Sequence, residues 1–157
     1  MLLGRIGKLE VQYLRIDQHN EWVDVLPQAN WLLLIIANEV QPPLFSSLTT
    51  ICIAHEPLYI CCVGEGAYIL EDWFDGEIVE TALAWEEKHQ GKFDYDLAPM
   101  TTADASLNEG FWFATSVAPA SNVSIETIFC LDLTNECQNR IQELIPLINT
   151  GWFPPDK

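Results

Sequence analysis

The stretch LYICCVGEGAYILEDWFDGEIVE, residues 58–80, brings together residue types that could do chemistry. An apolar run leads through Gly64 and Gly66 into an acidic segment, and a strand, a glycine turn and a helix N-terminus in this order commonly bind phosphate. The dinucleotide pattern G-x-G-x-x-G fails because Ile69 stands at the third glycine position, and no Gly-Lys-Ser/Thr follows for a Walker loop. Glu65 in the turn would also repel an anion. We therefore interpret the glycines as a tight turn with positive φ.

The carboxylates of this segment do not specify a metal site. Glu71, Asp72 and Asp75 are close enough on a helix to offer oxygen ligands to Mg²⁺ or Ca²⁺, but their spacing matches no EF-hand loop. The histidines stand apart, without an H-x-H or H-E-x-x-H pattern. A solvated acidic face is the ordinary interpretation, so we predict neither a metal nor a cofactor.

The sequence also offers no clear nucleophile. The serine motif G-x-S-x-G is absent. Cys61 and Cys62 are adjacent in an apolar run, and neither has a basic neighbour that would lower the pKa of its thiol. The five cysteines are an odd number, and most sit in apolar runs, which indicates reduced thiols in the core of a cytoplasmic protein. We predict no catalytic residue, and an enzyme remains an alternative.

The charge balance is the strongest global feature. The chain has 23 acidic and 7 basic residues, a formal net charge of −16, and no Lys or Arg between Arg15 and Lys88. Such a surface repels nucleic acid and anionic lipid and attracts basic proteins. Solubility alone is the other explanation of this charge.

The elements that would position these residues follow from apolar patterns. WLLLIIA at Trp31–Ala37 is a continuous apolar run, typical of a central strand that is covered on both faces. Leu70, Phe74, Ile78, Ala82 and Trp85 recur at steps of three or four, which predicts a long amphipathic helix. The expected strands are Leu9–Ile16, Trp31–Ala37, Leu58–Val63, Phe111–Val117 and Ile125–Leu133, and the expected helices are Leu44–His55, Ala67–His89 and a last one capped by Thr134 or Asn135 and ending at Asn149.

This order predicts an α/β fold. We expect a small sandwich with a central, partly parallel sheet of about four or five strands, helices packed on it, and a C-terminal β-hairpin followed by a helix. Residues 92–109 are expected to form a loop within a single domain that spans residues 1–157. No stretch is long and apolar enough for a signal peptide or a membrane span.

Three functional hypotheses remain. The first is a non-enzymatic acidic module, similar in size and charge to inhibitor or immunity proteins, that docks on a basic partner protein through aromatic anchors ringed by charge. The second is a small-ligand binder or enzyme with a cleft at the carboxyl ends of the central strands. The third is a subunit of a homo-oligomer such as a dimer. The candidate partner-binding residues are Glu71, Asp72, Trp73, Asp75 and Glu80, and the candidate cleft residues are Asn38, Glu39, Gly64 and Glu65.

Overall fold

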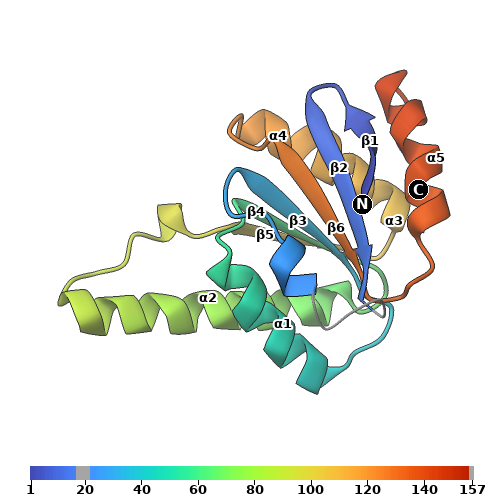
Figure 1. Cartoon of the computed structure of the whole chain (residues 1–157). Helices are drawn as coiled ribbons and strands as arrows, with labels where there is room; N and C mark the ends of the chain where they lie inside the picture. Colours follow the sequence, from blue (N-terminus) through green and yellow to red (C-terminus); the bar gives the residue numbers. More distant parts are fainter. Residues whose placement is uncertain (17–21, 156–157) are drawn as a thin grey trace.

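The centre of the fold is a sheet in the order β1-β2-β6-β3-β4-β5 (Figure 1). The computed structural model describes residues 1–16 and 22–155. β1 pairs antiparallel with β2, and every other pairing in the sheet is parallel. The strands are β1 (Leu2–Ile6), β2 (Leu9–Arg15), β3 (Trp31–Ile36), β4 (Tyr59–Val63), β5 (Met100–Asp104) and β6 (Thr127–Asp132).

Helices cover both faces of this sheet (Figure 1). Short 3₁₀ turns occupy Trp22–Val25 and Tyr95–Leu97. One face carries α1 (Pro42–Ala54) and α2 (Ala67–His89), and the other carries α3 (Leu107–Trp112), a π-helical turn (Phe113–Val117), α4 (Ala118–Ser121) and α5 (Gln138–Asn149). None of the helices in the described residues is long and apolar enough to cross a membrane.

β3 is the central strand, as its apolar sequence predicts. All six of its residues are buried, and they alternate between two cores because successive side chains point to opposite faces. Trp31, Leu33 and Ile35 pack with the helices α1 and α2. Leu32 and Leu34 pack with the helices on the other face.

The order in which strands are added to the sheet reverses at β3. It runs outward from β3 through α1, β4 and α2 to β5, and then returns across the opposite face through α3 and α4 to insert β6 on the other side of β3. The loops after β3 and β6 therefore diverge at the carboxyl ends of these strands, which is where ligands bind in many open α/β sheets.

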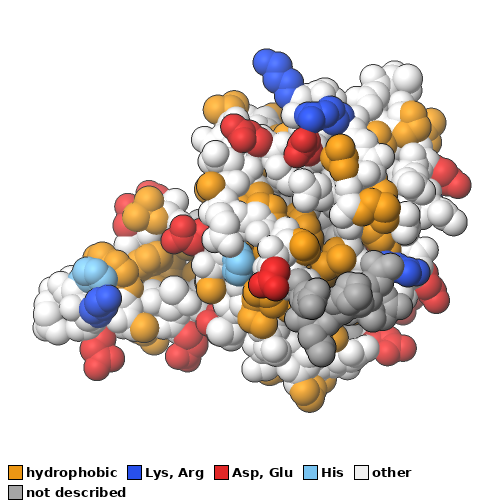
Figure 2. Space-filling model, in the orientation of Figure 1, with side chains coloured by type: hydrophobic (Ala, Val, Ile, Leu, Met, Phe, Trp, Pro, Cys, Tyr) orange, Lys and Arg blue, Asp and Glu red, His pale blue; other side chains and the backbone are white. Residues whose placement is uncertain are grey.

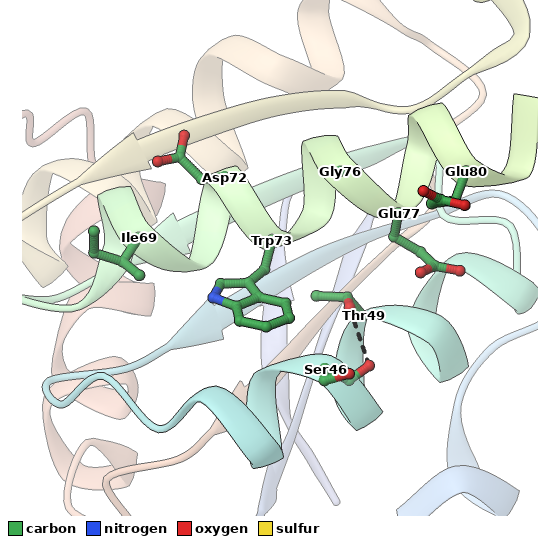
Figure 3. A pocket seen from close by; sticks show the side chains of 8 residues that line it. All are labelled: Ser46, Thr49, Ile69, Asp72, Trp73, Gly76, Glu77 and Glu80. Atoms are coloured by element: carbon green, nitrogen blue, oxygen red, sulfur yellow. Dashed lines mark hydrogen bonds between the residues drawn. The ribbon is translucent and has the colours of Figure 1, made fainter.

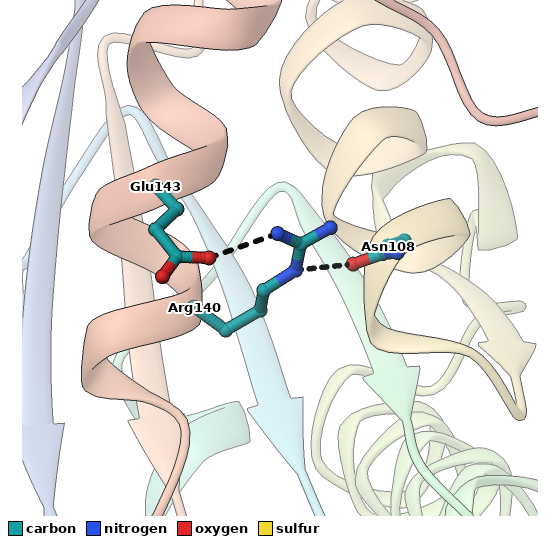
Figure 4. Close-up of polar contacts among 3 residues, drawn as sticks. All are labelled: Asn108, Arg140 and Glu143. Carbon is teal, nitrogen blue, oxygen red and sulfur yellow. Dashed lines mark hydrogen bonds and ion pairs between the residues drawn. The ribbon is translucent and has the colours of Figure 1, made fainter.

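An arginine connects two helices on this second face (Figure 4). Nε of Arg140 on α5 donates to Oδ1 of Asn108 on α3 at 2.9 Å. Nη1 of the same guanidinium pairs with Oε2 of Glu143 at 2.9 Å. The bond to Asn108 links α5 to the helical return that leads into β6, and the ion pair with Glu143 lies within α5.

The expected strand Phe111–Val117 is wrong, because these residues are helical. Leu107, Phe111, Ala114 and Ala118 pack into one core at helical steps of three and four. Ser106 caps the helix by accepting a hydrogen bond from the backbone N–H of Glu109. The predicted C-terminal hairpin therefore does not form, and the segment is instead part of a helical crossover.

Two further expectations change with it. The expected loop over residues 92–109 contains β5, an edge strand that pairs with β4, and the first residues of α3. The strand expected at Ile125–Leu133 does form as β6, but it is a parallel strand between β2 and β3. β1 was not anticipated, and it supplies the antiparallel edge.

The last helix starts later than its expected caps. α5 begins at Gln138 because Asp132 holds Thr134 and Asn135 in a turn by accepting their backbone N–H groups. The helix continues through Pro146 to Asn149.

Candidate functional site

α2 carries most of the candidate partner-binding chemistry. The helix spans Ala67–His89 as predicted and continues through Gly76. Leu70 and Phe74 are buried in the core against the sheet, Ala82 is also buried, and Trp85 is exposed. The C-terminal half of the helix projects beyond the sheet (Figure 1). The carboxylates of this helix are Glu71, Asp72, Asp75, Glu77, Glu80, Glu86 and Glu87, and its basic residues are Lys88 and His89 in the last turn.

A groove of about 510 Å³ runs between α2 and α1 (Figure 3). The indole of Trp73 lies between the two helices near Ser46 and Thr49, and the residue is 36% exposed. Gly76 leaves the centre of the groove open, since a Cβ built there would meet nothing within 4 Å. The groove is lined by Ser46, Thr49, Ile69, Asp72, Trp73, Gly76, Glu77 and Glu80.

The charge in this groove comes from one wall only. α1 contains no charged residue, so Asp72, Glu77 and Glu80 all belong to the α2 side. No ion pair within residues 1–16 and 22–155 includes a carboxylate of α2. An aromatic ring beside unpaired carboxylates is a favourable environment for an ammonium or guanidinium group.

The structure divides the predicted partner-binding residues between two sides of α2. Asp72, Trp73 and Glu80 line the groove, whereas Asp75 faces β5, where its Oδ1 accepts a hydrogen bond of 2.7 Å from Oγ1 of Thr101. Glu71 lies near Asp75 and is half-buried. Its pKa is raised by burial and by the charge of Asp75.

The second candidate site is a cavity of about 210 Å³ at the carboxyl ends of β3 and β6. Asn38 and Glu39 line it together with Gln41, Thr134 and Glu136. Gly64 and Glu65, which were expected in the same cleft, are not among its lining residues.

Gly64 has a structural role instead. Its φ of 109° is accessible to glycine, and a Cβ would collide with the backbone oxygen of Ala37. Two residues later, the backbone N–H of Gly66 donates to the same oxygen at 2.9 Å. The predicted tight turn is thus present and joins the loop after β4 to the end of β3, but the positive φ is confirmed for Gly64 and not for Gly66, whose φ is −89°.

Sequence reasoning missed a buried carboxylate beside this cavity. Asp132 at the end of β6 is fully buried and accepts hydrogen bonds from the Tyr13 hydroxyl at 2.6 Å and the backbone N–H of Cys137 at 2.8 Å. Burial and this hydrogen bond raise the pKa of Tyr13. The sequence Asp132-Leu-Thr134-Asn135 contains the signal, because aspartate commonly bonds the backbone two residues on. Asp132 positions the loop that carries Thr134 and Glu136.

The cysteines pack as the sequence predicts. All five are free thiols, and Cys52, Cys61, Cys62 and Cys130 are buried. Burial raises the pKa of Cys52 and of Cys61 to about 12, which is unsuited to a nucleophile at neutral pH. Among residues 1–16 and 22–155, no three His, Cys, Asp or Glu side chains are grouped so as to hold a metal ion.

A larger hollow of about 530 Å³ lies under the projecting end of α2. Hydrophobic side chains gather on this part of the surface (Figure 2). Trp85 stacks on His89 with ring centroids 4.2 Å apart and meets the edge of Phe93 at 5.9 Å. This cluster ties the end of the helix to the loop that returns to β5.

Comparison with known proteins identifies a family. The model of a family described as a domain of unknown function, DUF7684, matches residues 11–148, a range that begins in β2 and ends in α5. No curated protein and no solved structure matches the sequence.

Proposed function

We propose that this chain, which belongs to the DUF7684 family, is a non-enzymatic binding module that docks on a basic partner protein. The contact surface is the first half of α2 together with the groove beside α1. A lysine or arginine of the partner enters the groove over Gly76 and lies on the Trp73 ring, next to Asp72 and Glu80.

The groove geometry carries this proposal. A cation over an indole contributes about 0.5–1 kcal/mol at an exposed site and about 2 kcal/mol when it is desolvated. The carboxylates of Asp72, Glu77 and Glu80 add charge-assisted hydrogen bonds at the same place. Trp73 is exposed enough to be reached, and its ring lies between α2 and α1 (Figure 3).

The global charge supports the same partner. With a net charge of −16, the chain attracts a basic surface at long range, and steering of this kind raises association rates. The same field opposes nucleic acid and anionic membranes as partners. The free thiols favour a reducing compartment, so we place the protein in the cytoplasm.

A small-ligand site is the second candidate function. The cavity beside Asn38 and Glu39 lies where the loops after β3 and β6 diverge, the preferred ligand position in open α/β sheets. Glu39 and Glu136 would favour a small cationic ligand there.

The test is an NMR titration that follows the indole N–H of Trp73. The probe is arginine with blocked ends, and the matched control is citrulline with blocked ends, which has nearly the same shape without the charge. We expect the arginine probe alone to shift the Trp73 signal, with a dissociation constant in the millimolar range because few contacts are made. Equal shifts with citrulline, or no shift with either probe, would reject the groove as a cation site.

A further inference from the structure

The outer edge of β5 is a free sheet edge. Among residues 1–16 and 22–155, β5 is the last strand of the sheet and pairs only with β4. The backbone N–H of Gly64 donates to the backbone oxygen of Asp104 at 2.9 Å. This bond shows which residues of β5 direct their backbone N–H and C=O groups toward β4, because these directions alternate along a strand. Thr102 and Asp104 therefore turn their backbone groups toward β4, whereas Thr101 and Ala103 turn theirs outward.

These outward groups have no partner in the described part of the chain. No hydrogen bond within residues 1–16 and 22–155 uses the backbone N–H or oxygen of Thr101 or Ala103. β5 has no lysine, internal proline or bulge, three of the features that protect an edge strand, and its one charged residue is Asp104 at its end. The edge is thus a template on which an extended chain can add.

The sides of this edge define what such a chain must carry. On the α2 face, Glu71 and Asp75 stand beside Thr101, and the raised pKa of Glu71 reflects its burial and the nearby charge of Asp75. On the opposite face, Trp112 and Phe113 line a pocket of about 430 Å³, whose remaining lining residues are Asp104, Glu109, Phe153, Pro154 and Pro155. Because side chains alternate along a strand, an added strand would point basic residues toward α2 and apolar residues toward the pocket.

Charge also selects against a second copy of this chain. Pairing two β5 edges across a two-fold axis would bring the acidic α2 faces of two chains, each with a net charge of −16, toward one another. Their repulsion opposes self-pairing over the Debye length of about 8 Å in physiological salt. A segment of a basic protein reverses the sign of this interaction.

We infer that the edge of β5 binds an extended segment of the partner, with alternating basic and apolar residues, as a seventh strand of the sheet. Main-chain hydrogen bonds to Thr101 and Ala103 supply the attachment, and the flanking side chains supply the specificity. The inference rests on the proposed function for the sign of the partner's charge. The binding mode rests on the edge alone.

The probe is a short peptide with blocked ends that alternates lysine and valine. Hydrogen exchange at the Thr101 and Ala103 amides should slow by about tenfold or more when the peptide is added, because both amides gain a hydrogen-bond partner. A peptide with glutamate in place of lysine should have no effect. Unchanged exchange at both amides with a saturating lysine peptide would overturn the inference.

Two variants of one residue separate backbone pairing from side-chain effects. Thr101→Pro removes the outward N–H, which an edge strand tolerates because that group is not used in the sheet. Thr101→Val keeps the N–H and removes the hydroxyl that contacts Asp75. We expect T101P to weaken peptide binding by about tenfold and T101V to bind within about twofold of the parent chain, by NMR titration. Equal binding by T101P and T101V would contradict backbone pairing.

NMR shifts at the groove between α1 and α2 and at the edge of β5 distinguish the two proposed binding surfaces. A lysine peptide that shifts Trp73 and Gly76 but not Thr101 or Ala103 would uphold the proposed function and reject the edge. Shifts confined to β5 would uphold the edge and reject the groove.

Discussion

Gly76 offers the sharpest test of the groove, because folding and binding make opposite demands on it. The residue is the tenth of the 23 in α2, far from both ends. Its φ is not positive, and a Cβ there would meet no atom within 4 Å. Neither backbone conformation nor internal packing therefore requires glycine at this position.

The expected magnitude follows from helix propensity. Glycine inside a helix is about 0.8–1.0 kcal/mol less favourable than alanine, and the full difference applies at an unstrained, exposed site. Gly76→Ala should therefore raise the free energy of unfolding by about 1 kcal/mol, which corresponds to about 2–4 °C in Tm for a domain of this size. Gly76→Leu should stabilise to a similar degree, since leucine is also a good helix former.

Binding should change in the opposite direction. The leucine side chain would occupy the space between Trp73 and Glu80 that we assign to the partner's cation. Urea unfolding measures the stability gain, and titration with blocked arginine measures binding, which should weaken by at least about threefold in G76L, an interaction loss of about 0.7 kcal/mol. A loss of stability in G76A, or unchanged arginine binding in G76L, would refute the reasoning.

Three further outcomes are expected. Burial and the charge of Asp75 raise the pKa of Glu71, so the folded state keeps this proton to higher pH than the unfolded chain, and stability falls as pH rises through the range just above an ordinary glutamate pKa. Glu71→Gln should remove this fall and raise Tm at pH 7. Equal pH profiles of the variant and the parent chain would contradict this role of Glu71. Asp132→Asn should lower the free energy of unfolding by about 3 kcal/mol, more than Tyr13→Phe, since it disturbs all the bonds of a buried acceptor, and a loss below that of Tyr13→Phe in urea unfolding would contradict this role. In a thiol-reagent assay, the folded chain should react slowly and at Cys137 alone, whereas the unfolded chain should show five reactive thiols. Fast reaction of a second thiol in the folded chain would contradict the burial of the other four cysteines.

Much of the fold follows from patterns in the sequence. β3, β4 and α2 were predictable because continuous apolar runs and steps of three or four survive in the packing of the buried residues. The segment Phe111–Val117 was mistaken for a strand because its aromatic and β-branched residues favour strands locally. The helical spacing of Phe111, Ala114 and Ala118 and the cap at Ser106 decide the outcome.

The site was predictable only in outline. The sequence identified Asp72, Trp73 and Glu80 on one helix, but the groove also needs Ser46 and Thr49 from α1, and no sequence pattern pairs the two helices. The sequence did not predict β5 because this strand, MTTAD, is short and mostly polar. Its position at the edge depends on strand order, which is a property of the tertiary structure.

The central claim is that the acidic face of α2, rather than net charge, recruits a basic partner. The most direct measurement compares two variants of equal net charge as baits for proteins from the source organism: Asp72→Lys with Asp75→Lys on α2, and Asp24→Lys with Glu126→Lys at exposed positions elsewhere. The affinity of the purified partner for each bait is then measured at low and high salt. We predict that the parent chain and the second variant bind the same basic protein, whereas the affinity of the α2 variant for that protein is about tenfold lower or more at low salt. Equal loss in both variants, or undiminished binding by the α2 variant, would contradict the account.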